Sequence, residues 1–235
     1  MIKIYGKNCV YEAIKAKSPI EKLYVLDEEY YKEHSLRNLI DKSGLSFSLI
    51  NKKTIDKLCP NTHQGYYAER NDYKIYNEND LESFIKNQGR ILILDGIQDP
   101  HNLGAIIRSV DAFGFDLIIL PKNRSASVNE TVAHTSTGAI EYVNIMYVNS
   151  LPNICNKLKK LGYWIVSTDA KGDVKADGID KDLSLALIIG SEGFGVSKTL
   201  LNLSDFHLMI PMVGHVNSLN ASVSAGIIIE KFLRL

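Results

Sequence analysis

The stretch ILILDGIQDPHNLGAIIRS at residues 91–109 sets the pattern for most of the chain. ILILD has the apolar, β-branched character of a buried strand, and apolar side chains recur at helical spacing from about Asn102 onward. Asn102 occupies the place expected for the N-terminal cap of that helix. Further apolar runs alternate with helical stretches; they are DLIIL, YVNIMYV, YWIVST, LALIIG and FHLMIP. This alternation predicts a mostly parallel sheet covered by helices.

A smaller α/β unit is expected before this region. Its predicted elements are strands at 23–26 and 47–50 and helices at 34–42 and 54–58. The polar, asparagine-rich stretch at 71–79 has no clear period, which indicates a linker. The predicted organisation is a first domain over 1–70, a linker over 71–88 and a second domain over 89–235.

The composition is ordinary for a globular protein. The chain has 235 residues, of which 45% are hydrophobic and 23% charged, and 27 basic side chains balance 27 acidic ones. These values exclude a collagen, a disordered chain and a disulfide scaffold. No apolar run approaches the roughly 20 residues that cross a bilayer, and the first residues lack a signal or transit pattern. We expect a cytoplasmic protein without membrane contact.

Cysteines and charge say little about partners. Cys9, Cys59 and Cys155 are far apart and form no C-x-x-C pair, so neither a disulfide framework nor a zinc site is expected. We interpret the thiols as small apolar side chains. Residues 1–70 carry 12 basic and 9 acidic side chains, which is a mild surplus. Charge alone therefore does not identify a nucleic-acid partner.

Two polar residues of the opening stretch have alternative interpretations. Arg108 lies about 140° from Leu103 on a helical wheel, away from the apolar stripe. Taken alone, such an arginine is interpreted as a surface side chain. Asn102 is either a helix cap with no other role or part of a site.

A second motif, LALIIGSEGFGVS at 185–197, runs from an apolar strand into three glycines and a carboxylate. Gly190, Gly193 and Gly195 allow positive φ and close approach of a ligand, or simply form a tight turn. Their G-x-x-G-x-G spacing differs from the dinucleotide fingerprint and lacks the Lys-Ser/Thr ending of a P-loop, which argues against NAD and ATP. Glu192 lies at the end of a strand where open α/β sheets bind ligands, although a plain loop carboxylate is the alternative.

The third motif, IPMVGHVNSLNASVSAGIIIEKF at 210–232, couples a strand end, a loop and a helix expected over 219–233. That helix is apolar on most faces, so it is either core or a subunit interface. Ser218 and Asn220 at its start are candidate capping residues.

In this order the three motifs resemble the SpoU (TrmH-type) RNA 2′-O-ribose methyltransferases of the SPOUT superfamily. The combination is N-L-G-x-x-x-R-S, G-x-E-G-x-G and I-P-M-x-G-x-V-x-S-L-N-x-S-V. PKNRSASVNETV at 121–132 matches as well. YGKNCVYEAI and HQGYYAE near the N-terminus resemble that family's L30e-like substrate-binding domain. The two-part arrangement is similar to the RlmB-type enzymes that methylate guanosine in large-subunit rRNA.

The resemblance implies an α/β fold in which a small L30e-like domain precedes a parallel-sheet domain with a trefoil knot. It also implies S-adenosylmethionine as the cofactor, bound by the knot loops, and no metal. The positions that match the family's cofactor contacts are Gly190, Ile210, Ser218 and Leu219.

The catalytic positions are likewise implied by the resemblance. Arg108 matches the family's catalytic arginine, for which we expect binding of a phosphate and stabilisation of a developing alkoxide, because a guanidinium is very hard to deprotonate. Asn102, Glu192 and Asn220 match the other polar positions and are expected to orient Arg108 and the ribose. Family members pair as homodimers through the knotted domain, and Arg108 is expected to act across that interface.

The implied function is 2′-O-methylation of a guanosine ribose in 23S rRNA, with tRNA as the alternative substrate. A non-catalytic RNA-binding module is a second alternative, but such a module would not need all three motifs. A nicotinamide-dependent oxidoreductase is disfavoured because no acidic ribose-binding residue follows a G-x-G-x-x-G turn.

Overall fold

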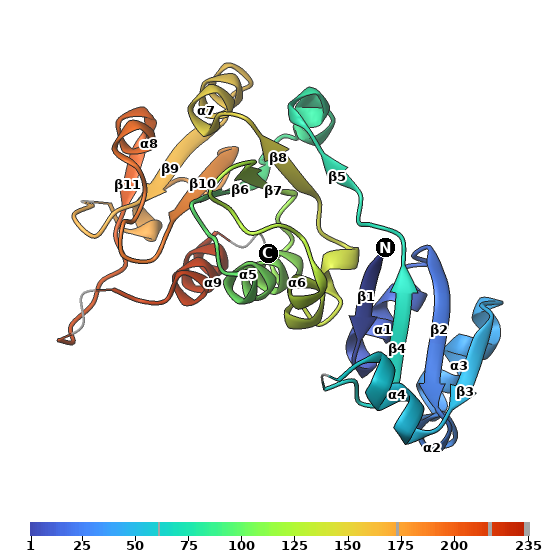
Figure 1. The fold of residues 1–235 in the computed structure, drawn as a ribbon. Helices are drawn as coiled ribbons and strands as arrows, with labels where there is room; N and C mark the ends of the chain where they lie inside the picture. The colour runs from blue at the N-terminus through green and yellow to red at the C-terminus, as the bar shows by residue number, and fades with distance from the viewer. Residues whose placement is uncertain (61, 173, 216–217, 233–235) are drawn as a thin grey trace. The chain divides into compact units, whose positions relative to one another are not determined.

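The computed structural model describes residues 1–60, 62–172, 174–215 and 218–232, and Figure 1 shows their fold. The chain forms two compact units. The first unit contains Met1–Tyr73 and Val128–Tyr142, and the second unit contains Lys74–Ser127 and Val143–Leu235.

The first unit is built on a four-stranded sheet. Its strands, in spatial order, are β1 (Ile2–Tyr5), β4 (Tyr66–Arg70), β2 (Ile20–Leu26) and β3 (Phe47–Ile50). β4 is antiparallel to β1 and β2, whereas β2 and β3 are parallel. The helices are α1 (Lys7–Lys15), α2 (Asp27–Lys32), α3 (His34–Ser43) and α4 (Lys52–Leu58). The two strands and two helices predicted between 23 and 58 are confirmed, with β2 starting earlier than expected.

A segment that is distant in sequence, Val128–Tyr142, also belongs to the first unit. It carries α6 (Glu130–Thr135) and the 3₁₀ helix η2 (Ala139–Glu141). The Arg70 guanidinium pairs with the Glu141 carboxylate, and both side chains are almost fully buried. The His134 ring stacks on Tyr5 with 4.4 Å between ring centroids. Such long-range pairs leave no local pattern, so the domain prediction over 89–235 does not include this packing.

The second unit is built on a seven-stranded sheet in which every neighbouring pair is parallel. Its strands, in spatial order, are β11 (Phe206–Leu208), β9 (Trp164–Thr168), β10 (Leu185–Gly190), β6 (Arg90–Asp95), β7 (Leu117–Pro121), β8 (Ile145–Val148) and β5 (Ile75–Tyr76). The six apolar runs predicted as strands are all confirmed, and so is the parallel arrangement.

The stretch expected to be a linker contains regular structure. β5 pairs with β8 at the edge of the sheet. The 3₁₀ helix η1 (Glu78–Phe84) buries Leu81 and Phe84 in the core of the second unit. The linker prediction over 71–88 therefore misses two elements, because a two-residue strand is too short to show a period.

Helices cover both faces of the large sheet (Figure 1). α5 (Pro100–Ala112) packs against α9 (Ala221–Lys231) on one face, and α7 (Leu151–Lys160) packs against α8 (Lys198–Leu203) on the other. β6 and β10 at the centre are buried at every position except the last. Continuous apolar runs are typical of parallel strands covered on both faces.

The sequence order of the strands reverses between β6 and β10. β7 and β8 follow β6 on one side, whereas β9 and β11 lie beyond β10 on the other. In open α/β sheets, ligands bind outside the carboxyl ends of the strands at such a point. The fold thus marks the ends of β6, β9 and β10 as the place to look for a site. The trefoil knot implied by the resemblance stays a prediction.

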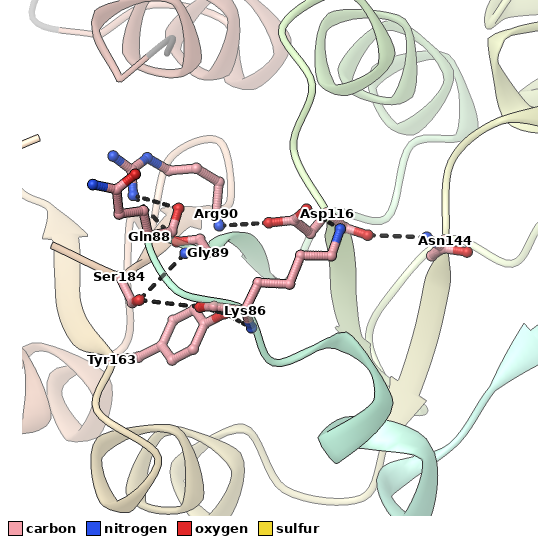
Figure 2. Close-up of polar contacts among 8 residues, drawn as sticks. All are labelled: Lys86, Gln88, Gly89, Arg90, Asp116, Asn144, Tyr163 and Ser184. Atoms are coloured by element: carbon pink, nitrogen blue, oxygen red, sulfur yellow. Dashed lines mark hydrogen bonds and ion pairs between the residues drawn. The ribbon is translucent and has the colours of Figure 1, made fainter. Parts of the chain in front are cut away.

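Polar groups form a hydrogen-bond network at the amino-terminal ends of the strands, opposite the end where ligands are expected (Figure 2). The Asp116 carboxylate accepts hydrogen bonds from the Arg90 backbone N–H and from Lys86 Nζ, each at 2.8 Å. Asn144 Nδ2 donates to the Asp116 carbonyl at 3.0 Å. Arg90, Asp116 and Asn144 lie at or just before the starts of β6, β7 and β8, so the network fixes three neighbouring strand starts.

Candidate active site

Three of the predicted catalytic residues meet at the carboxyl edge of the large sheet. Asn220 Nδ2 donates to Asn102 Oδ1 at 3.0 Å and to Glu192 Oε1 at 3.4 Å. Asn102 comes from α5, Glu192 from the loop after β10, and Asn220 from the residue before α9. We call these three side chains the polar triad. The structure brings together residues separated by up to 118 positions in the chain.

Asn220 is held in place from its other side. Its side chain caps α9, because Oδ1 accepts hydrogen bonds from the backbone N–H groups of Ser222 at 2.9 Å and Val223 at 3.4 Å. With Oδ1 occupied by the cap, the Nδ2 group is left to donate to the other two members of the triad. The capping interpretation of Asn220 is thus confirmed, although the helix starts at Ala221 and not at 219.

The predicted cap of the other helix is wrong. α5 begins at Pro100, and Asp99 caps it by accepting a hydrogen bond from the His101 N–H at 3.0 Å. Proline suits the first helical position because its fixed φ is helical and its missing N–H would have no helical partner there. Asn102 therefore lies inside the first turn, and its side chain is available to accept the hydrogen bond from Asn220.

Arg108 does not join the polar triad within one chain. It lies further along α5 than Asn102 by about 9 Å of helix rise and is turned about 120° around the axis. Its side chain is exposed and, within the described parts of the chain, has no hydrogen bond or ion pair. The next residue, Ser109, approaches Gly226 of α9, with Oγ 3.6 Å from the place of a Cβ. The turn that carries Arg108 thus crosses α9.

A cavity of about 520 Å³ opens at the ends of β9, β10 and β11. All four predicted cofactor-binding residues line it; they are Gly190, Ile210, Ser218 and Leu219. Glu192 lines it too, so the cavity and the polar triad share one side chain. The cavity is therefore continuous with the polar site.

The glycines of the second motif are required by the folding of their own loop. A Cβ on Gly190 would lie 2.0 Å from the carbonyl carbon of Gly195, which no side chain could tolerate. Gly193 and Gly195 have φ of +86° and +66°, a region that favours glycine. The Ser197 N–H donates to Asp95 Oδ2 at 2.8 Å, which ties the loop to the end of β6.

Sequence reasoning missed several residues that line the cavity. Thr168 is the last residue of β9 and is followed by Asp169 and Ala170, Phe194 lies in the glycine loop, and Met212 belongs to the third motif. A signal for the first three existed, because Thr168 ends the predicted strand YWIVST and the other two directly follow it, at the end of the sheet where ligands bind. Phe194 and Met212 carry no such positional signal.

Thiols and acidic side chains are the remaining candidates for metal chemistry among the described residues. All three cysteines are buried, which confirms their interpretation as apolar residues, and burial raises the pKa of Cys9 and of Cys155 to about 12. In the parts of the chain that the structure describes, no group of three or more His, Cys, Asp or Glu side chains is placed to hold a metal ion. None of the described helices is long and apolar enough to cross a membrane.

The chain matches two known protein-family models. Residues 89–230 match the model of the SpoU rRNA Methylase family. The chain belongs to the SpoU rRNA methylase family. Residues 3–76 match a second model, described as RNA 2′-O ribose methyltransferase substrate binding. The resemblance inferred from the motifs is confirmed, and the protein is a SpoU-family RNA methyltransferase.

Bacterial relatives match along nearly the whole chain. A TrmH family tRNA/rRNA methyltransferase of Staphylococcus aureus is 38% identical, and the alignment covers 98% of this chain and 95% of the relative. A protein of the same name from Staphylococcus saprophyticus is 39% identical, covering 99% and 95%. The SpoU assignment therefore applies to both units of the chain.

Solved structures confirm the fold class. The SpoU methyltransferase AviRb from Streptomyces viridochromogenes, in complex with AdoMet, has a TM-score of 0.81 at 24% identity and covers 98% of this chain and 88% of its own. AdoMet-bound rRNA methyltransferase from Sinorhizobium meliloti gives 0.79 at 22%, covering 98% and 86%. The TrmH/SpoU tRNA modifying enzyme of A. aeolicus gives 0.56 at 28%, covering 63% and 75%.

Proposed function

We propose that this SpoU-family protein transfers the methyl group of S-adenosylmethionine to the 2′-hydroxyl of a ribose in RNA. The observation that carries this proposal is a polar triad whose Glu192 lines a cavity together with all four predicted cofactor positions. The RNA that we propose is large-subunit rRNA, and the ribose is that of a guanosine.

The cavity fits the proposed cofactor in size and chemistry. Ligand pockets commonly measure about 300–1,000 Å³, and this one measures about 520 Å³. Leu208, Ile210 and Leu219 give it apolar walls suited to an adenine ring, while Asp169 and Glu192 supply carboxylates that can accept hydrogen bonds from ribose hydroxyls or face a cationic group. AdoMet occupies the AviRb and S. meliloti structures, which supports this assignment.

The reaction needs positioning more than covalent catalysis. When bound, S-adenosylmethionine supplies a methyl group activated by a sulfonium; an O–C bond forms, the C–S bond breaks with its electron pair going to sulfur, and the hydroxyl loses a proton. We assign to Asn102 and Asn220 the orientation of the ribose hydroxyl. Glu192 is the only titratable member of the triad, so we assign the hydroxyl proton to its carboxylate, directly or through a water.

Arg108 is proposed to complete the site from a second copy of the chain. Its exposed guanidinium lies where α5 crosses α9, and α9 exposes Val223 and Ile227, which are 49% and 39% accessible. When one face of a helix packs in the core and its opposite face exposes apolar side chains, the exposed face indicates a subunit interface. We propose a homodimer through the second unit, in which Arg108 of one protomer binds a phosphate and stabilises the alkoxide that develops beside the partner's triad.

We propose rRNA and not tRNA as the substrate because a solved rRNA enzyme matches a larger share of this chain than a solved tRNA enzyme does. The tRNA modifying enzyme covers 63% of this chain, whereas the S. meliloti rRNA enzyme covers 98%. We propose that residues 1–70 bind the RNA substrate and that residues 89–235 carry the methyltransferase. Ribosomal RNA as substrate also supports a cytoplasmic location.

The test is methyl transfer from labelled S-adenosylmethionine into unmodified large-subunit rRNA and tRNA, each incubated separately with the protein. We expect label in rRNA, at a nucleotide whose 3′ linkage has become resistant to alkali, because alkaline cleavage needs a free 2′-hydroxyl. Label in tRNA alone would replace the substrate assignment. A labelled nucleotide whose linkage is still cleaved by alkali would contradict ribose methylation.

A further inference from the structure

Phe194 is an aromatic residue that the fold does not bury. Its side chain is 95% exposed, although phenylalanine is among the residues most often found in protein interiors. It lies in the loop between β10 and α8, two residues after Glu192. An exposed ring at that place is not explained by the packing of the chain.

The loop geometry holds the ring away from the core. The Gly195 N–H donates to the Ser191 carbonyl at 2.9 Å, which closes residues 191–195 into one turn. Gly193 and Gly195 flank the ring and both have positive φ. Because other residues rarely adopt this conformation, the two glycines fix a sharp turn with Phe194 at its tip.

The position of the ring places it beside the substrate path. Phe194 lines the same cavity as Glu192, and Glu192 accepts a hydrogen bond from Asn220. A molecule that brings a hydroxyl group to the polar triad therefore has Phe194 next to it. In an RNA, the groups attached to or flanking that ribose are a phosphate and a nucleobase.

We propose that Phe194 stacks on a nucleobase of the RNA substrate beside the ribose that is methylated; this inference rests on the proposed function. A phosphate is a poor match, because residues 190–197 contain no basic side chain and Glu192 would repel it. A base presents a flat π face to the ring. Since every base has such a face, the stacking contributes affinity for RNA and not selection of one base.

Substitutions separate stacking from other roles of the ring. Phe194→Ala and Phe194→Leu are expected to raise the dissociation constant for RNA about 5- to 100-fold, while Phe194→Trp stays near the wild-type value. The dissociation constants are measured by titration with unmodified rRNA in the absence of turnover. Leu161→Ala, which trims an exposed apolar side chain after α7, is the matched control and should bind RNA as the wild type does.

A fluorescent reporter can detect the contact directly. Trp164 is the only tryptophan in the chain, so Trp164→Phe combined with Phe194→Trp gives a protein with one indole at the loop tip. Adding unmodified rRNA should change the emission of that indole. The natural Trp164 lies at the start of β9, at the other end of the strand from the cavity, and its emission in the otherwise wild-type protein should not change.

Several outcomes would overturn the inference. RNA affinity that is unchanged in Phe194→Ala would do so, and so would equal losses in Phe194→Ala and Phe194→Trp. If Phe194→Ala instead weakens S-adenosylmethionine binding or dissociates the dimer, the ring belongs to the cofactor or to the partner subunit. RNA binding is measured without turnover, so RNA affinity that depends on Phe194 in a protein that transfers no methyl would contradict the proposed function alone.

Discussion

Asn220 performs two tasks with the two ends of one amide group. Its oxygen caps α9 and its nitrogen donates to Asn102 and Glu192. A serine could supply the capping oxygen but not the nitrogen. Capping of α9 alone would therefore not need an asparagine at this position, whereas donation to the polar triad does.

Arg108→Lys tests the role proposed for the guanidinium. Lysine keeps the positive charge but lacks the planar fork that binds a phosphate and a second oxygen together. We expect the variant to bind RNA within about threefold of the wild type and to lose about 100-fold or more in turnover. Single-turnover methylation and an RNA-binding titration measure the two quantities, and an unchanged rate would remove the assignment.

Buried thiols and phenols predict how stability depends on pH. Burial raises the pKa of Cys9 and of Cys155 from 9.0 to about 12, and it also raises the pKa of Tyr66, Tyr67 and Tyr73. The folded state thus favours the neutral forms, and the unfolded chain releases protons first as pH rises.

The contribution of these groups to the free energy of unfolding should accordingly be constant below pH 9. Above pH 9 it should fall, by at most about 1.4 kcal/mol per pH unit for each thiol. Urea unfolding at pH 8 and at pH 10.5 measures this, and equal midpoints at the two values would contradict it.

At the scale of elements, the packing at the starts of the central strands leaves no room for a side chain at Gly89. Gly89 precedes β6, and a Cβ there would lie 1.7 Å from Tyr163 Oη (Figure 2). The Gly89 N–H also donates to Ser184 Oγ at 3.2 Å. Tyr163 and Ser184 precede β9 and β10, so this glycine lies at the junction of three central strands.

Gly89→Ala should therefore lower the free energy of unfolding by about 1–3 kcal/mol, the usual cost of overpacking. The matched control is Gly178→Ala in the 3₁₀ helix η3 (Ala176–Gly178), where a Cβ would meet its nearest neighbour at an ordinary 3.6 Å. Chemical denaturation of both variants checks this, and similar stabilities would show that Tyr163 moves aside at little cost.

The elements that could be predicted are those with a long, uniform signal. The central strands β6, β7 and β10 are buried at every position except the last, so each is a continuous apolar run. β5 could not be predicted because two residues show no period. The predicted start of α5 is too late in the sequence, because asparagine is a common capping residue and the prediction places the cap at Asn102. Proline at position 100 would have been the better guide.

The site was predictable in its residue types but not in its assembly. Strand ends, glycine spacing and the family resemblance identified Glu192, Asn220 and Gly190. No local pattern shows that Asn220 donates to Asn102 across 118 positions, or that Glu141 pairs with Arg70 and brings residues 128–142 into the first unit. Such pairs form only when the chain folds.

At the scale of the whole molecule, the proposed homodimer completes each site with residues from two chains. Arg108→Ala and Asn220→Ser should each be inactive alone, because each removes one part of every site. In a mixed dimer, one of the two sites keeps both residues if Arg108 acts across the interface. Mixing the variants after reversible unfolding should then restore about a quarter of wild-type activity. No recovery, with mixed dimers shown to form, would place Arg108 in the site of its own chain.

The central claim is that the cavity binds the methyl donor while the neighbouring triad serves the ribose. Calorimetric titration with S-adenosylmethionine tests it most directly. The proteins compared are the wild type, Asn220→Ser, Leu219→Asp in the cavity wall and the control Leu161→Asp. Leu219 and Leu161 are matched in exposure, at 36% and 38%. We predict binding by all except Leu219→Asp, with Asn220→Ser binding the donor but transferring no methyl. A folded wild-type protein with no affinity for S-adenosylmethionine, or Leu219→Asp binding it normally, would contradict the account.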